Sequence, residues 1–311
     1  MGCGSSLNAR RKGGQKKSAF NRNFLILRRV NESMNFMTPA EISAAAANAG
    51  KAKTELPFGK MFLLGILAGV YIGFGANLAT KVGAAPDAGS AMGIFLFGAV
   101  FSVGLMLVVI AGAELFTGNN MACMISALNG QASWGGLLYN WVVVWVANLL
   151  GSLLLVYIIY NGSYWGDVAA LSAMGTKAVA IAKGKITLSF FEIFCRAICC
   201  NWLVCLAVWL GFAAKDVIGK IFGIFFPIMA FVSSGFEHCV ANMYFIPMGI
   251  TVANGAVDAT AEAFAMTPEA VTSLFTYGNF FTVNLIPATL GNIVGGALFV
   301  ACFYWFVYLK K

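Results

Sequence analysis

Six long hydrophobic segments, separated by shorter polar stretches, dominate the pattern of positions along the chain. Each is long enough to cross the roughly 30 Å of hydrocarbon in a bilayer as a helix. They cover residues 59–81, 92–116, 136–160, 189–213, 221–250 and 284–308. The pattern therefore predicts an all-α integral membrane domain with six transmembrane helices over residues 56–311, preceded by an arm over residues 1–55.

Two of the six segments carry the same polar interruption. In the second, Glu114 is followed five residues later by Asn119, and in the fifth, Glu237 is followed five residues later by Asn242. Both are the middle segments of two three-helix halves. Corresponding breaks in two halves are typical of transport folds built from inverted repeats. Because each half has an odd number of spans, the second half should be inverted relative to the first.

Composition places the chain in lipid. Of its 311 residues, 60% are hydrophobic and 10% are charged, whereas soluble domains carry about 25% charged residues. Residues 1–60 hold eleven Lys or Arg and three Asp or Glu, and the rest holds nine of each sign. A basic arm can bind nucleic acid, but beside a membrane helix it favours a cytoplasmic terminus and no nucleic-acid partner. Because six spans return the chain to the side where it started, both termini are then cytoplasmic. Only the third connection, with Lys177, Lys183 and Lys185, opposes the positive-inside rule, by which Lys and Arg stay on the cytoplasmic side.

The arm contains two further signals. Thr38 and Glu41 frame a capping box with Pro39 at the first helical position, which predicts a short amphipathic helix over about 40–53 at the interface. Gly2 and Cys3 fit the patterns for myristoylation and palmitoylation, which would attach the arm to a cytoplasmic leaflet, most simply at the plasma membrane. The alternative is an unmodified Gly/Ser tail.

The cysteines indicate no metal or cofactor. Four of the eight lie in one apolar segment, at positions whose spacing matches no zinc site: Cys195, Cys199, Cys200 and Cys205. We interpret them as buried free thiols that behave as small apolar residues.

Few ionisable residues lie at membrane depth, where each is a candidate functional group. Glu192 and Arg196 are one helical turn apart and can form an ion pair. His238 is the only histidine, and imidazole exchanges a proton near neutral pH, as handling a weak acid requires. We expect Glu114 and Glu237 to stabilise the breaks by accepting backbone N–H bonds, so that helix N-termini point inward and favour an anion.

Four ordered motifs make the chain resemble the formate/nitrite transporter family over residues 35–310. They cover the two broken helices and the fourth and sixth segments: 112–119, 200–209, 234–243 and 284–292. The resemblance implies an aquaporin-like protomer with broken second and fifth helices, in a homopentamer where each protomer has its own pore. The chain, like that family, lacks the Asn-Pro-Ala pairs of true aquaporins.

The resemblance also implies roles for individual residues. His238 matches the family's central histidine and Thr117 its hydrogen-bonding partner, with Asn201 and Asn292 as accompanying polar groups. Lys185 resembles a lysine of the outer vestibule, for which the alternative is a snorkelling lysine at a helix end. Five residues resemble the apolar constrictions: Phe101, Leu105, Leu115, Phe116 and Phe231.

These observations favour transport of small monovalent weak-acid anions of the formate, nitrite and lactate class, linked to protons through His238. A passive anion channel for formate, nitrite or hydrosulfide is the alternative, and a non-transporting receptor or scaffold is a weaker one. An intramembrane enzyme is disfavoured because the chain has one histidine and no cluster of metal ligands or paired intramembrane aspartates. Residue types alone do not select among the anions.

Overall fold

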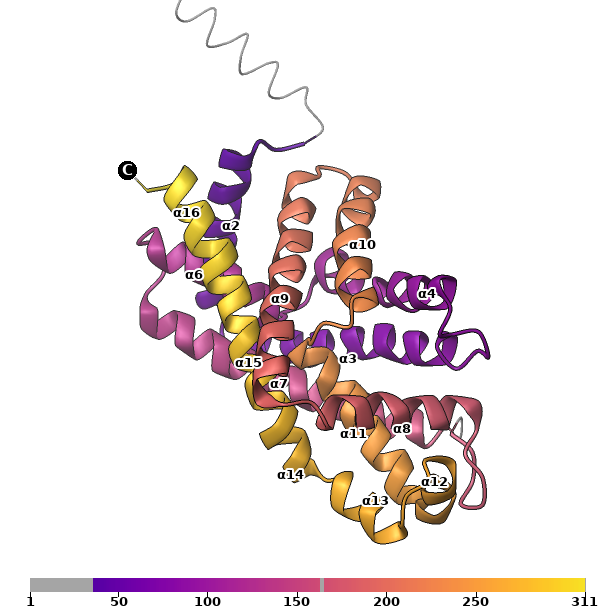
Figure 1. Ribbon diagram of the computed structural model, residues 1–311. Coiled ribbons are helices and arrows are strands. Elements are labelled where there is room, and N and C mark those ends of the chain that lie inside the picture. The colour runs from indigo at the N-terminus through magenta and orange to yellow at the C-terminus, as the bar shows by residue number, and fades with distance from the viewer. Residues whose placement is uncertain (1–35, 163–164, 311) are drawn as a thin grey trace, which may run out of the picture.

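The computed structural model describes residues 36–162 and 165–310, and most of them are helical (Figure 1). The helices of the first half are α2 (Pro39–Thr54), α3 (Phe58–Val82), α4 (Ala91–Phe101), α5 (Val103–Met106), the π-helical η1 (Leu107–Gly112), α6 (Phe116–Leu128) and α7 (Trp134–Tyr160). Those of the second half are α8 (Ala173–Ile186), α9 (Phe190–Ala213), α10 (Val217–Ser233), α11 (Cys239–Gly255), α12 (Val257–Ala263), α13 (Pro268–Leu274), α14 (Tyr277–Asn279), the π-helical η2 (Phe280–Leu285), α15 (Ile286–Ile293), the π-helical η3 (Val294–Cys302) and α16 (Phe303–Tyr308).

The described residues contain five helical runs that are long and apolar enough to cross a membrane, or six if the bent pair of α11 and α12 is one span. This agrees with the predicted number. The first, third and fourth predicted segments match α3, α7 and α9 to within two residues at each end. Their uninterrupted apolar character fixes these boundaries well.

The second and fifth segments break where the sequence predicts. The run from α4 through η1 ends at Gly112, and the chain resumes as a helix only at Phe116. Helix α10 ends at Ser233 and α11 begins after His238. Gly112 and Gly235 have φ angles of 90° and 70°, a region that side chains with a Cβ rarely adopt. Each glycine therefore ends its helix and turns the chain toward the middle of the bundle.

The sixth predicted segment starts too late at residue 284. The last helical run begins at Tyr277, within a candidate membrane span that covers Pro268–Tyr308, because Thr276 caps it by accepting a hydrogen bond from the Asn279 backbone N–H at 3.1 Å. The prediction missed this start because residues 277–283 are mixed in polarity. The run continues to Tyr308 through η2, α15, η3 and α16.

A short helix precedes each half and packs against the second piece of that half's broken span. Helix α2 begins with the predicted capping box of Thr38 and Glu41 and packs on α6, and α8 packs on α11. The segment before α2 is tied to the end of α9, since Met37 N donates to Ala213 O at 2.8 Å. The short helices α2 and α8 thus occupy corresponding places in the two halves.

Glycines let the corresponding outer helices approach closely. A Cβ added at Gly69 of α3 would overlap the Asn148 carbonyl of α7, and one at Gly291 of α15 would overlap the Phe194 carbonyl of α9. Small residues at such contacts are typical of membrane helix pairs. Helix α2 and the C-terminal α16 lie at one end of the molecule, and α12 and α13 lie at the other (Figure 1). This arrangement agrees with an even number of crossings.

Candidate functional site

His238 is positioned by the break in the second half, where it is the N-cap residue of α11. Its side chain is 2% exposed. The Ala241 backbone N–H donates to His238 Nδ1 at 2.9 Å, which satisfies one of the donors that a helix start leaves without a partner. The same bond fixes the orientation of the ring.

Thr117 lies opposite, in the first turn of α6, and is fully buried. Its Oγ1 is 3.0 Å from His238 Nε2, the contact that the family resemblance implies. Because Nδ1 accepts from Ala241, the hydrogen-bond network assigns the proton of the neutral ring to Nε2. Nε2 therefore donates to Thr117 Oγ1, and this hydrogen bond joins the second pieces of the two broken spans, α6 and α11.

Aromatic rings enclose this pair on one side. Phe231 stacks on the His238 ring with centroids 5.8 Å apart, and Phe101 meets Phe231 edge-on, also at 5.8 Å. Both phenylalanines are almost fully buried. The imidazole therefore lies in a narrow apolar environment, with Thr117 as its polar neighbour.

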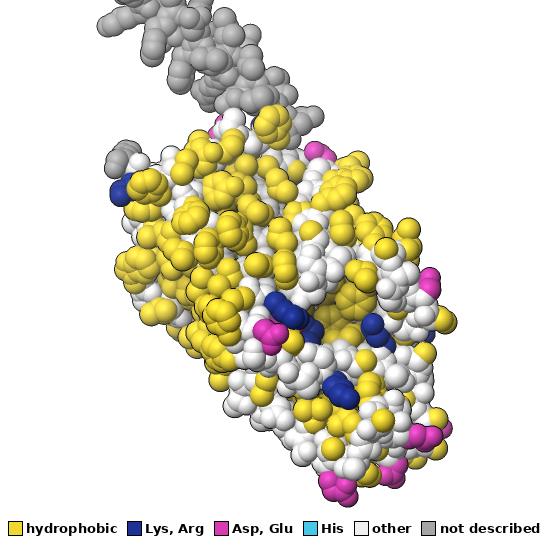
Figure 2. Space-filling view, in the orientation of Figure 1, with side chains coloured by type: hydrophobic (Ala, Val, Ile, Leu, Met, Phe, Trp, Pro, Cys, Tyr) yellow, Lys and Arg dark blue, Asp and Glu magenta, His cyan; other side chains and the backbone are white. Residues whose placement is uncertain are grey.

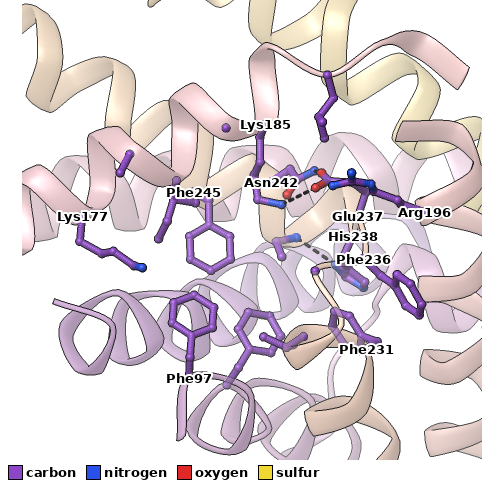
Figure 3. A pocket seen from close by; sticks show the side chains of 18 residues that line it. Phe97, Lys177, Lys185, Arg196, Phe231, Phe236, Glu237, His238, Asn242 and Phe245 are labelled. Carbon is purple, nitrogen blue, oxygen red and sulfur yellow. Dashed lines mark hydrogen bonds and ion pairs between the residues drawn. The ribbon is translucent and has the colours of Figure 1, made fainter. Parts of the chain in front are cut away.

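A cavity of about 350 Å³, which we call the α8 vestibule, opens beside this aromatic wall. Phe101, Phe231 and His238 line it, together with Lys177 and Lys185 from α8 and Arg196 from α9. Figure 2 shows basic side chains gathered around a hollow whose surface is hydrophobic. Figure 3 shows the Phe97 and Phe245 rings beside Lys177 and Lys185, with His238 farther along the cavity near Phe231.

A second cavity, the α2 vestibule, has a volume of about 510 Å³ and is lined by Lys53, Leu105, Glu114 and Leu115, among others. Leu105 is one helical turn from Phe101 of the α8 vestibule, a rise of about 5.4 Å. The two cavities therefore approach each other to within about one turn of helix. The buried side chains between them include four of the five predicted constriction residues.

An ion pair stabilises the break beside the α8 vestibule. Lys185 Nζ donates to Glu237 Oε1 at 2.8 Å, and Asn242 Nδ2 donates to Glu237 Oε2 at 2.6 Å. Asn284 joins the two partners, since its amide donates to the Lys185 carbonyl at 3.0 Å and accepts from Asn242 at 2.7 Å. The side chains of Lys185 and Glu237 are 17% and 3% exposed.

The same network is repeated beside the α2 vestibule. Lys53 Nζ donates to Glu114 Oε1 at 2.8 Å, and Asn119 Nδ2 donates to Glu114 Oε2 at 2.7 Å. Asn140 donates to the Lys53 carbonyl at 3.1 Å and accepts from Asn119 at 2.9 Å. Every member of the first network thus has a counterpart, as an inverted repeat requires, and Leu115 occupies the position that corresponds to His238.

The two carboxylates do not bond the freed backbone N–H groups, so that expectation was wrong. Two other side chains do this. Asn148 Oδ1 accepts from Phe116 N at 2.9 Å, and Asn292 Oδ1 accepts from Cys239 N at 2.8 Å. A neutral amide can accept this bond and also donate to nearby carbonyls, whereas a carboxylate only accepts. The glutamates are instead held by a lysine and by asparagine amides.

The remaining predicted site residues lie behind the pore. Asn201 donates to the Thr117 carbonyl at 3.2 Å and to the Asn292 carbonyl at 2.6 Å, so it supports the residue that contacts His238. Phe116 packs edge-on against Trp141 and lines neither vestibule. Gly2 and Cys3 lie outside the described residues.

Sequence reasoning missed Lys53, Asn140 and Asn148. A signal for Lys53 was present, because Lys51-Ala-Lys53 precedes the first span as Lys183-Gly-Lys185 precedes the fourth. Asn140 and Asn148, both on α7, have hydrogen-bond partners in the first half that correspond to the partners of Asn284 and Asn292 in the second half. An alignment of the two halves would have brought all three residues forward.

Two structural interpretations need correction. Among the described residues, Glu192 and Arg196 form no ion pair; Glu192 instead completes a capping box with Ser189 at the start of α9. Cys200 and Cys205 are buried as expected, but Cys195 and Cys199 are exposed on the other side of α9. In a membrane helix both the lipid-facing and the protein-facing sides are apolar, so the sequence did not distinguish them.

A family model described as "Formate/nitrite transporter" matches residues 40–306 of this chain. The chain belongs to this family. A relative from Methanothermobacter thermautotrophicus, named "Probable formate transporter", is 48% identical over 292 residues, covering 89% of this chain and 99% of the relative. The formate channel FocA of Escherichia coli (strain K12) is 37% identical over 289 residues, covering 91% of this chain and 98% of FocA.

Solved structures agree with the family. One described as a pentameric formate channel with formate bound is 39% identical, with a TM-score of 0.70 over 81% of this chain and 98% of that chain. Another, an FNT family ion channel, is 28% identical with a TM-score of 0.69 over 86% of this chain. The predicted all-helical membrane fold is therefore confirmed as that of the formate/nitrite transporter family, and the chain is an integral membrane transport protein.

Proposed function

We propose that this chain transports formate and similar small weak-acid anions across the membrane together with a proton. The observation that carries the proposal is the His238–Thr117 hydrogen bond, which is buried in an apolar constriction between two vestibules that each hold a lysine. The names of the relatives support formate as the first substrate to test. Nitrite and lactate belong to the same class of small monovalent anions.

The constriction disfavours a bare anion. Phe101, Phe231, Leu105 and Leu115 are each at most 3% exposed, and moving an ion into such surroundings costs several kcal/mol even after relaxation. A neutral weak acid avoids this cost. A carboxylate that takes a proton in the vestibule can therefore cross the constriction where the anion cannot.

The vestibules favour the arrival of the anion. The N-terminal ends of α6 and α11 place partial positive charge near the centre of the pore, which favours anions. In the α8 vestibule, Lys177 adds a cation outside the Lys185–Glu237 pair and raises the local concentration of anions. In the α8 vestibule, Lys185 is 5.8 Å from the centroid of the Phe245 ring. The lysine favours the anionic form of a carboxylate held there. Protonation becomes favourable as the carboxylate leaves the lysine for the apolar surroundings of Phe101 and Phe231, because desolvation disfavours the charged form.

His238 contributes a hydrogen bond to the passing acid. Its Nδ1 accepts from the Ala241 backbone, so protonation of Nδ1 would set two N–H groups against each other and remove the cap of α11. The ring therefore works in its neutral form. The accompanying proton comes from the bulk solution on the entry side through water in the vestibule, so His238 orients the acid and is not the proton donor that the sequence led us to expect. Thr117 and the Nε2–H group can each re-orient their hydrogen bond toward an oxygen of the substrate.

We further propose that both termini are cytoplasmic, that the membrane is the plasma membrane and that five protomers assemble, each with its own pore. Lys215 and Lys220 follow α9 at the end where Met37 contacts Ala213, so the positive-inside rule favours a cytoplasmic location for that end. The pentameric structural relative supports the assembly. Acylation of Gly2 and Cys3 stays a prediction.

Uptake of labelled formate, nitrite and lactate into cells that lack their own transporters tests the proposal. We expect saturable uptake that is faster at acidic pH than at neutral pH. The His238→Phe variant should abolish or sharply reduce it while the protein still reaches the membrane. Wild-type protein at the cell surface that carries none of the three anions would overturn the proposal.

A further inference from the structure

The two vestibules differ in charge although their ion-pair networks match. In the α2 vestibule the charged lining residues are Lys53 and Glu114, which are paired with each other. The α8 vestibule has the corresponding pair of Lys185 and Glu237, and two additional cations. At neutral pH the lining of the α8 vestibule therefore carries two more positive charges than that of the α2 vestibule.

Arg196 is the more unusual of the two additional cations. It lies on α9, is partly buried and lines the α8 vestibule. Within the described part of the chain, it makes no hydrogen bond, ion pair or ring contact. Its neighbour one turn earlier, Glu192, accepts instead from the Ser189 N–H and hydroxyl at 2.9 and 2.7 Å. The guanidinium group thus has five donors and no protein acceptor.

Lys177 is the second cation, and it is also half-buried. Its Nζ lies 5.7 Å from the centroid of the Phe97 ring, and no carboxylate pairs with it among the described residues. Figure 3 shows Lys177 and Arg196 at opposite sides of the vestibule, with Lys185 between them. The vestibule therefore has on either side a cation that forms no ion pair with any described residue, although the Glu192 carboxylate also attracts Arg196 electrostatically.

A guanidinium group matches a particular kind of anion. Its planar fork donates two parallel hydrogen bonds to an anion with two oxygens on one atom, such as a carboxylate or nitrite. A spherical anion such as chloride cannot use both donors in this way. Lysine, as a point charge, attracts either kind without distinguishing them.

We propose that Arg196, assisted by Lys177, forms a docking site that binds two-oxygen anions in the α8 vestibule before they reach His238. This inference deepens the proposed function and rests on it. Arg196 is then a specificity-determining residue, and the lysines concentrate anions around it. The α2 vestibule has no such site, so anions entering from that side should bind more weakly.

Chemical modification gives a direct test, because Arg196 is the only arginine after residue 29. Phenylglyoxal modifies arginine, and mass spectrometry of the peptide that contains Arg196 reports its rate in the purified wild-type protein. Formate and nitrite should slow this modification in a saturable way, and equal concentrations of chloride should not. Equal protection by chloride, or no protection by any anion, would overturn the proposal.

Variants separate docking from transport. Arg196→Gln should raise the formate concentration that half-saturates flux from the α8 side by about tenfold, the equivalent of about 1.4 kcal/mol, with a smaller effect from the α2 side. Arg196→Lys should fall between it and the wild type. Lys183→Gln removes a charge from α8, the helix of Lys177 and Lys185, at a residue outside the vestibule lining, where Nζ lies over Phe264. It should leave the half-saturating formate concentration unchanged from either side.

The same experiments distinguish failure of this inference from failure of the proposed function. In the His238→Phe variant, formate should still protect Arg196 even though transport is lost, because docking precedes the constriction. Protection in a wild-type protein that carries no formate would support the docking site and refute transport. Normal transport without protection would refute the docking site alone.

Discussion

Removing one member of the Lys185–Glu237 pair should destabilise the protein more than removing both. The two atoms are 2.8 Å apart, and the side chains are 17% and 3% exposed. Lys185→Met leaves the Glu237 carboxylate buried with only the amides of Asn242 and Asn284 as partners. Glu237→Gln leaves the lysine without its counter-charge. The double variant buries neither charge.

The size of the effect follows from burial. Breaking a buried pair by removing one partner costs about 3–5 kcal/mol, whereas replacing both partners is often close to neutral. We expect Lys185→Met to be near the lower end, because two amides still solvate the carboxylate, and Glu237→Gln to cost less, because the lysine can reach water. In a double-mutant cycle of the wild type, the two single variants and the double variant, the coupling energy between Lys185 and Glu237 should then be about 2–3 kcal/mol.

The first half of the repeat supplies an internal control. Lys53 and Glu114 are also 2.8 Å apart, but their side chains are more exposed, at 24% and 8%, so their coupling energy should be smaller. Unfolding by sodium dodecyl sulfate in mixed micelles, followed by circular dichroism, measures both cycles. Additive costs in the Lys185–Glu237 cycle, within about 0.5 kcal/mol, would refute the reasoning that the carboxylate requires its lysine.

Three further variants test other contacts. Thr117→Val keeps the shape of the side chain but leaves the buried His238 Nε2–H without its acceptor, which costs about 1–3 kcal/mol. Formate flux should therefore fall about tenfold or more, whereas Thr117→Ser, which keeps the hydroxyl, should retain most of the flux. Equal flux in the two variants would contradict this role of Thr117. Gly69→Ala pushes a methyl group into the Asn148 carbonyl and should reduce the yield of folded protein, in contrast to Gly59→Ala, where space is open; equal yields would contradict the close approach of α3 and α7. Thr38→Ala removes the cap of α2 and should speed amide hydrogen exchange there about fivefold. Hydrogen bonds from the Thr38 backbone N–H and hydroxyl lower the pKa of Glu41. The protection of α2 amides that the Thr38–Glu41 capping box provides should therefore be complete above the ordinary carboxyl pKa and be lost as the pH falls through the lowered pKa of Glu41. Protection factors that do not change with pH would contradict this contribution of Glu41.

The sequence identified the elements that depend on local composition and missed contacts that depend on docking between distant segments. Helices α3, α7 and α9 follow from apolar length, and the two breaks follow from the repeated Glu and Asn spacing. The carboxylate partners Lys53 and Lys185 lie on α2 and α8. These helices pack against α6 and α11, and no local sequence pattern predicts that packing. The expected backbone partners of the glutamates were wrong for this reason.

The family resemblance contributed what residue chemistry alone did not. It paired Thr117 with His238 across 121 positions of sequence, and the structure confirms that contact at 3.0 Å. It also placed Phe116 among the constriction residues, whereas the ring packs against Trp141. Within an apolar helix, composition does not reveal whether an aromatic side chain faces a pore, lipid or another helix.

Simultaneous measurement of formate flux, internal pH and membrane potential in proteoliposomes tests the central claim most directly. The account predicts that formate enters through the protein with a proton, so that the interior acidifies and the flux is unaffected when valinomycin sets the potential. Protein-free liposomes and the His238→Phe variant control for formic acid that crosses the lipid unaided. Flux that follows the imposed potential without acidification beyond these controls would show a passive anion channel and contradict the account.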